Sequence, residues 1–151
     1  MKTLILGFGN TILSDDGVGI KVAQEIKKRI SDVEVKEASI SGLSILEEIT
    51  GYDRVVVIDS IKTHSGEPGE LYKFCLDDFK PTIHLSSPHE VNFATAIELG
   101  RKYGYELPNL IDIYAIEIED DRTFSEECTE RIKKAIPDIV EQIIEDMSGR
   151  K

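Results

Sequence analysis

A chain of 151 residues, 40% hydrophobic and 31% charged, fits a single domain over residues 1–151 with one proper core. The formal net charge of −11 argues against a nucleic-acid binder, which presents a basic face, and against binding to anionic membranes. The same charge permits a cationic partner or a metal ion, and good solubility explains it equally well.

The first half of the chain alternates between strand and helix patterns. Residues 3–8 form a continuous apolar run, which predicts a buried strand, and residues 16–30 carry apolar side chains four positions apart, which predicts an amphipathic helix. Residues 33–36 alternate between apolar and charged side chains and predict a short strand. A short helix is expected over 43–49, and the valine-rich run 55–58 predicts another strand.

The second half continues the alternation. Residues 70–76 have period two and predict a strand that is antiparallel to its neighbour in a hairpin. Residues 89–103 predict a helix, and 110–118 predict a strand. We expect the last helix to begin at Ser125 as its N-cap. Strands separated by helices predict an α/β fold, with a mostly parallel sheet covered on both faces.

The expected compartment follows from what the sequence lacks. No segment has 18 apolar residues in a row, so we expect no membrane insertion. The apolar stretch after Met1 is too short for a signal peptide and is typical of a first strand. Cys75 and Cys128 fit no metal or redox spacing, so we expect two ordinary thiols in a reduced, cytoplasmic protein.

The segment GFGNTILSDDGVG, residues 7–19, follows the first predicted strand. Its opening, Gly7–Asn10, is similar to a phosphate-binding loop, but the third glycine of a dinucleotide fingerprint is replaced by Ile12. Asp15 and Asp16 would also repel a pyrophosphate, at a cost on the order of 4 kcal/mol for two unit charges about 4 Å apart. The glycines are therefore expected to provide a tight turn.

Three polar side chains are expected at one rim of the sheet. In an open parallel sheet, ligands bind beyond the carboxyl ends of the strands. Asp16 follows the first predicted strand, Asp59 stands directly behind 55–58, and His89 opens a predicted helix. Two carboxylates and one imidazole can bind a divalent metal and leave positions open for water or substrate.

Each of these residues also has a structural explanation. Asp16 could complement the positive end of the first long helix, with Ser14 as its cap. Asp59 could accept hydrogen bonds from turn amides. A single histidine is more often structural than functional, and His84 or, less well placed, His64 could supply the imidazole instead.

Three stretches together resemble the hydrogenase maturation endopeptidases. They are GFGNTILSDDGVG, the aspartate that follows the strand in VVVIDS, and HEVNF. The first is the most specific, because G-x-G-N followed by D-[DE]-G-x-G is far more restrictive than a glycine pair. The resemblance runs from residue 3 to about residue 140, and TFSEECTERI is similar to the segment before the family's last helix. Enzymes of this family remove a short C-terminal peptide from the precursor of the nickel–iron hydrogenase large subunit.

The resemblance implies a three-layer α/β/α sandwich with a twisted, mainly parallel five-stranded sheet and one antiparallel strand. It also implies a nickel-binding, catalytic trio, which falls here on Asp16, Asp59 and His89. The sequence leaves open whether nickel acts in catalysis or is a recognition mark already seated in the precursor.

The loop through Gly7, Gly9 and Asn10 is expected to shape the first turn and the approach of the precursor. Two other functions stay open from the sequence. One is a nucleotide-binding module that uses this loop, and the other is a nickel-binding chaperone without enzymatic activity.

Overall fold

The computed structural model describes residues 1–38, 45–76 and 93–149. In chain order, its elements are β1 (Thr3–Phe8), the 3₁₀ turn η1 (Ser14–Gly17), α1 (Val18–Arg29), β2 (Glu34–Ala38), α2 (Ile45–Ile49), β3 (Arg54–Ile61), β4 (Leu71–Cys75), α3 (Phe93–Lys102), β5 (Leu110–Glu117) and α4 (Glu130–Ser148). The start of the helix predicted over 89–103 lies outside the described residues.

The strands form one five-stranded sheet in the order β2-β1-β3-β5-β4. β2, β1, β3 and β5 are parallel to one another, and β4 is antiparallel to β5. The predicted hairpin between β4 and the strand before it is wrong, because β5 lies between them. β5 is almost entirely buried whereas β4 is half exposed, so the more apolar strand takes the central place beside β3.

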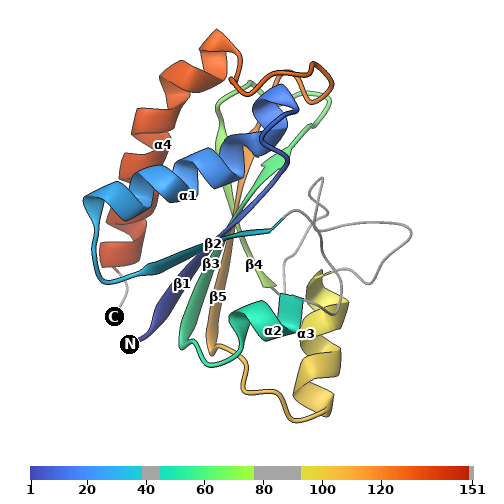
Figure 1. Cartoon of the computed structure of the whole chain (residues 1–151), viewed down its shortest axis with the longest axis vertical. Helices are drawn as coiled ribbons and strands as arrows, with labels where there is room; N and C mark the ends of the chain where they lie inside the picture. The colour runs from blue at the N-terminus through green and yellow to red at the C-terminus, as the bar shows by residue number, and fades with distance from the viewer. Residues whose placement is uncertain (39–44, 77–92, 150–151) are drawn as a thin grey trace.

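Helices cover both faces of the sheet, as Figure 1 shows. In β3, Val56 and Ile58 belong to the core cluster that includes α1 and α4, whereas Val55 and Val57 belong to the cluster that includes α2 and α3. Successive side chains of a strand point to opposite faces, so this alternation divides the core into two layers. The predicted three-layer α/β/α sandwich is confirmed.

The start of the last helix differs from the prediction. α4 begins at Glu130 with Thr129 as its N-cap, four positions along the chain from the expected N-cap. Ser125 is instead paired in a parallel bridge with Leu13, and its N–H donates to the carbonyl of Ile12 at 3.0 Å. Residues 126–129 are not helical, and within this segment the Ser125 hydroxyl accepts the N–H of Glu127 at 3.1 Å instead of capping a helix.

Two further expectations concern the described part of the chain. Cys75 and Cys128 are both free thiols, as predicted. Across residues 1–38, 45–76 and 93–149, we find no helix that combines the length and the apolar character needed to span a membrane.

Candidate functional site

Asp16 lies beyond the carboxyl end of β1, in η1. Its side chain is almost fully buried, and its Oδ2 accepts the N–H of Asn10 at 3.0 Å. The expected role of Ser14 as a helix cap is wrong, because α1 has Gly17 as its N-cap and no side chain caps it. The loop backbone therefore fixes the Asp16 carboxylate in a defined position at the rim of the sheet.

Glycine is required in the loop that leads to Asp16. Gly9 has a φ of +149°, and a Cβ there would lie 2.3 Å from the carbonyl oxygen of Asp16. The Gly9 N–H donates to the carbonyl of Ala38 at 3.2 Å, and the Asn10 N–H donates to Asp16. These two amides are already used within the chain, so they do not form a phosphate cradle, and the nucleotide-binding function is not favoured.

Asp59 lies within β3, and the prediction that it stands behind the strand is wrong. β3 continues as far as Ile61 because it pairs with β5 along its whole length, with Asp59 opposite Ala115. Asp59 is fully buried, and its Oδ1 accepts the N–H of Ser60 at 2.7 Å. By strand alternation its side chain is on the same face as Val57, the face covered by α2 and α3.

The two aspartates belong to the same rim of the sheet. A Cβ on Gly19, in the first turn of α1, would lie 2.3 Å from the carbonyl oxygen of Ile58 and 2.7 Å from that of Phe8. The start of α1 therefore packs against the carboxyl end of β1 and against β3 at the residue before Asp59, and η1 contacts β3. Asp16 lies in the turn after β1 and Asp59 lies in β3, and these two strands are neighbours in the sheet.

The histidines have different positions relative to this rim. His89, the third predicted ligand, and His84, its competitor, lie outside the described residues. His64 is exposed in the loop after β3. Within the part of the chain that the structure describes, there is no group of three or more His, Cys, Asp or Glu side chains that could hold a metal ion.

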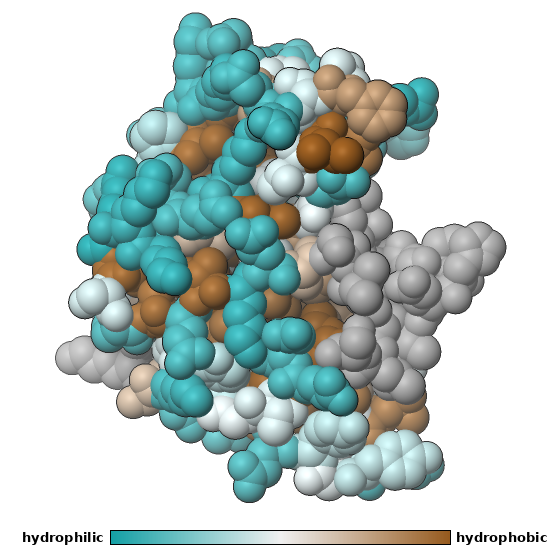
Figure 2. Space-filling view, viewed as in Figure 1, coloured by the Kyte–Doolittle hydropathy of each residue, from teal (hydrophilic) through white to brown (hydrophobic). Residues whose placement is uncertain are grey.

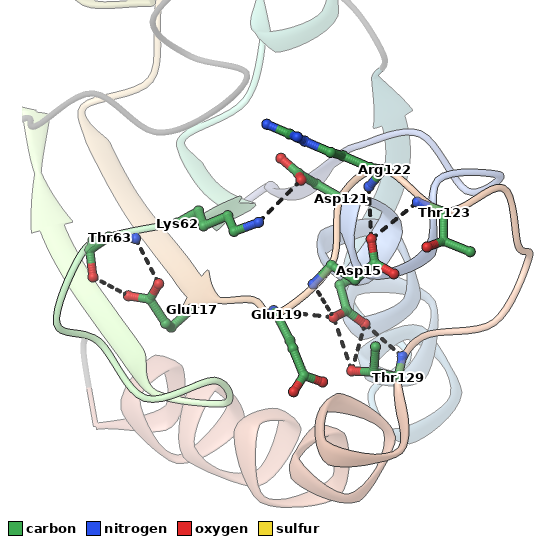
Figure 3. Close-up of polar contacts among 10 residues, drawn as sticks. Asp15, Lys62, Thr63, Glu117, Glu119, Asp121, Arg122, Thr123 and Thr129 are labelled. Carbon is green, nitrogen blue, oxygen red and sulfur yellow. Dashed lines mark hydrogen bonds and ion pairs between the residues drawn. The ribbon is translucent and has the colours of Figure 1, made fainter.

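Asp15 has a structural role that the sequence did not reveal. It is fully buried, and its carboxylate accepts the N–H groups of Thr129 at 2.7 Å, Glu119 at 3.2 Å and Asp120 at 3.0 Å, together with the Thr129 hydroxyl at 3.0 Å. Figure 3 shows this carboxylate between the loop after β5 and the start of α4. We call these residues the Asp15 network. It ties η1, and thus the neighbouring Asp16, to a segment more than 100 residues away.

Glu117, at the carboxyl end of β5, is a second buried carboxylate that sequence analysis missed. It accepts the backbone N–H and the hydroxyl of Thr63, each at 2.7 Å (Figure 3). It also accepts the hydroxyl of Tyr72 at 3.0 Å. Burial, with the hydrogen bond to Glu117, raises the pKa of Tyr72. Glu117 thus fixes the loop that follows β3 beside the rim. The contacts of Glu117 and Asp15 join distant segments, and no short motif signals them.

The fold and the rim define an α/β protein in which buried carboxylates gather where the parallel strands end. A family model described as hydrogenase maturation protease matches residues 3–146. The chain therefore belongs to the hydrogenase maturation protease family.

Individual relatives agree with this family. The chain is 25% identical over 121 residues to the hydrogenase 2 maturation protease of Escherichia coli, a match that covers 77% of this chain and 73% of that protein. The solved structure of the maturating endopeptidase HybD from E. coli has a TM-score of 0.79 at 22% identity, with 99% and 93% of the two chains covered. HycI from Thermococcus kodakarensis has a TM-score of 0.69 at 25% identity, with 95% and 90% covered.

Proposed function

We propose that this protein is an endopeptidase that removes the C-terminal extension of a nickel–iron hydrogenase large-subunit precursor after nickel insertion. The family match over residues 3–146 carries the proposal. It is supported by the rim itself, because Asp16 and Asp59 stand in the motifs that the family resemblance singled out and both are buried, one in the loop after β1 and the other near the carboxyl end of β3.

Asp16, Asp59 and His89 would contact the nickel ion of the precursor. Carboxylate oxygens and an imidazole nitrogen suit a divalent first-row ion, and three protein ligands leave positions open. Such a ligand set discriminates poorly among these metals, so selectivity for nickel has to come from the ligands of the precursor. An ion held by these residues would supply Lewis-acid chemistry, which can polarise a carbonyl or activate a water.

The protein's own residues then have a positioning role. The Asn10 N–H holds the Asp16 carboxylate, and the Ser60 N–H holds that of Asp59. In both contacts the acceptor is a carboxylate oxygen, and hydrogen bonds to carboxylates are stronger than those between neutral groups. The two carboxylates are thereby oriented before the precursor arrives, which reduces the cost of ordering them on binding.

The test is cleavage of nickel-loaded and nickel-free precursor, followed by mass spectrometry. The reaction contains a chelator too weak to remove nickel from the precursor. We expect the loaded precursor to lose its C-terminal peptide and the nickel-free form to stay intact. Efficient cleavage of the nickel-free form would show that nickel in the precursor is not required. Binding of nickel without cleavage of either form would favour a chaperone.

Alanine variants test the three proposed ligands separately. Asp16→Ala, Asp59→Ala and His89→Ala should each abolish cleavage and weaken cadmium or nickel binding, while circular dichroism shows a folded protein. His84→Ala is the matched control and should cleave normally. If His84→Ala abolishes metal binding and His89→Ala does not, the wrong histidine has been assigned.

A further inference from the structure

Two large apolar side chains are exposed on neighbouring loops beside the proposed site. Phe124 is 82% exposed and Ile12 is 50% exposed. The N–H of Ser125 donates to the carbonyl of Ile12 at 3.0 Å, so the two loops lie side by side. We call this surface the Ile12–Phe124 patch. Figure 2 shows apolar side chains grouped on the upper part of the surface, where the segment before α4 runs in Figure 1.

Backbone hydrogen bonds hold together the two loops that carry the patch. Leu13 and Ser125 form a parallel bridge, and the N–H of Ser14 donates to the carbonyl of Ser125 at 2.9 Å. The Asp15 network joins the same two loops a second time, because the Asp15 carboxylate accepts hydrogen bonds from residues 119, 120 and 129. Apolar residues exposed singly are ordinary, whereas contiguous exposed apolar surface marks an interaction site, and Ile12 and Phe124 are presented from loops that are bonded to each other. A preorganised surface also loses little conformational entropy when a partner binds.

We propose that the Ile12–Phe124 patch binds an apolar segment of the precursor protein, so this inference rests on the proposed function. Ile12 belongs to the same loop that leads to Asp16, and a precursor that reaches Asp16 has to pass this loop. Ile12 is four positions before Asp16, so a protein substrate that engages Asp16 would also contact the patch.

The surrounding charge favours this partner over a second copy of the same chain. Segment 117–130 contains seven carboxylates and one arginine, and the whole chain carries a formal charge of −11. Two copies docked through this patch would bring like charges together, which is unfavourable. The segment of the precursor that contacts the patch should accordingly be apolar and neutral or basic at its flanks.

Serine variants test the patch by binding and by kinetics. Phe124→Ser and the double variant with Ile12→Ser are compared with Tyr103→Ser, a control that truncates an aromatic residue that is 72% exposed next to α3. Binding of purified precursor is measured by biolayer interferometry, and cleavage by mass spectrometry. We expect Kd and KM to rise about tenfold in the double variant, with kcat and the control unchanged, as for loss of an interface hot spot.

Binding and cleavage are read separately, so the two proposals can fail independently. A double variant that binds the precursor as tightly as the wild type would overturn the docking surface, even if the wild type cleaves. The same holds if the substitutions change only self-association in sedimentation experiments. Patch-dependent binding without any cleavage would keep the surface and overturn the endopeptidase function.

Discussion

Replacing Asp15 by alanine should destabilise the fold strongly, although the carboxylate is not a proposed metal ligand. The substitution removes the fully buried acceptor of three partly buried hydrogen bonds, whose donors are the N–H groups of Glu119, Asp120 and Thr129. A buried donor without a partner costs about 1–3 kcal/mol, so the expected loss is about 3–5 kcal/mol once some water enters the site. For a domain of this size, that lowers Tm by roughly 10 °C.

Urea unfolding followed by circular dichroism measures this loss directly. Asp32→Ala is the matched control, because Asp32 is exposed in the loop before β2. We expect the control to lie within about 0.5 kcal/mol of the wild type, as surface substitutions usually do. If Asp15→Ala unfolds within about 1 kcal/mol of the wild type, the Asp15 network does not stabilise the fold as its hydrogen bonds indicate.

Three further predictions address single features. Gly9→Ala should reduce cleavage of the precursor severely, because its Cβ would lie 2.3 Å from the carbonyl oxygen of Asp16; normal cleavage would contradict this. Cys75 should react with a thiol reagent in the native protein, whereas Cys128 should react only after unfolding, because it is buried and burial raises its pKa; equal rates would be inconsistent with this. Burial, with a hydrogen bond to a carboxylate, raises the pKa of Tyr52 from 10.0 to about 12, so its contribution to stability is complete below pH 10 and is lost as pH rises through 12. Replacement of this tyrosine by phenylalanine should flatten that alkaline loss in unfolding experiments.

The fold was largely predictable because strands that are buried on both faces of the sheet have continuous apolar sequences. The continuous apolar runs of β1 and β3 identify buried parallel strands, and the four-residue spacing in α1 identifies a helix on one face. The pattern does not encode which strand lies beside which. β4 was therefore assigned to its neighbour in sequence, although pairing over the full length of β5 separates the two.

The site was predictable only where a local motif coincides with a strand end. Asp16 and Asp59 follow or end apolar runs, and their place at one rim follows from parallel topology. Asp15 and Asp16 are adjacent and both are buried, and nothing in the sequence indicates that Asp15 bonds to residues 119–129, so its structural role is not predictable. The Ser125 cap failed for a related reason, because its backbone bonds to Ile12 and its neighbours, and such long-range pairing overrides local capping preference.

The Asp15 network also sets the order in which the protein becomes competent during synthesis. The loop that carries Asp16 leaves the ribosome more than 100 residues before the backbone amides that fix its neighbour, which belong to residues 119–129. Closing so long a loop costs entropy that only the finished contact repays. A nascent chain that lacks Thr129 therefore contains the loop with Asp15 and Asp16 but lacks a hydrogen bond that holds this loop in its folded position. Processing activity should consequently appear only after residues 119–129 have been synthesised and have formed their hydrogen bonds with Asp15.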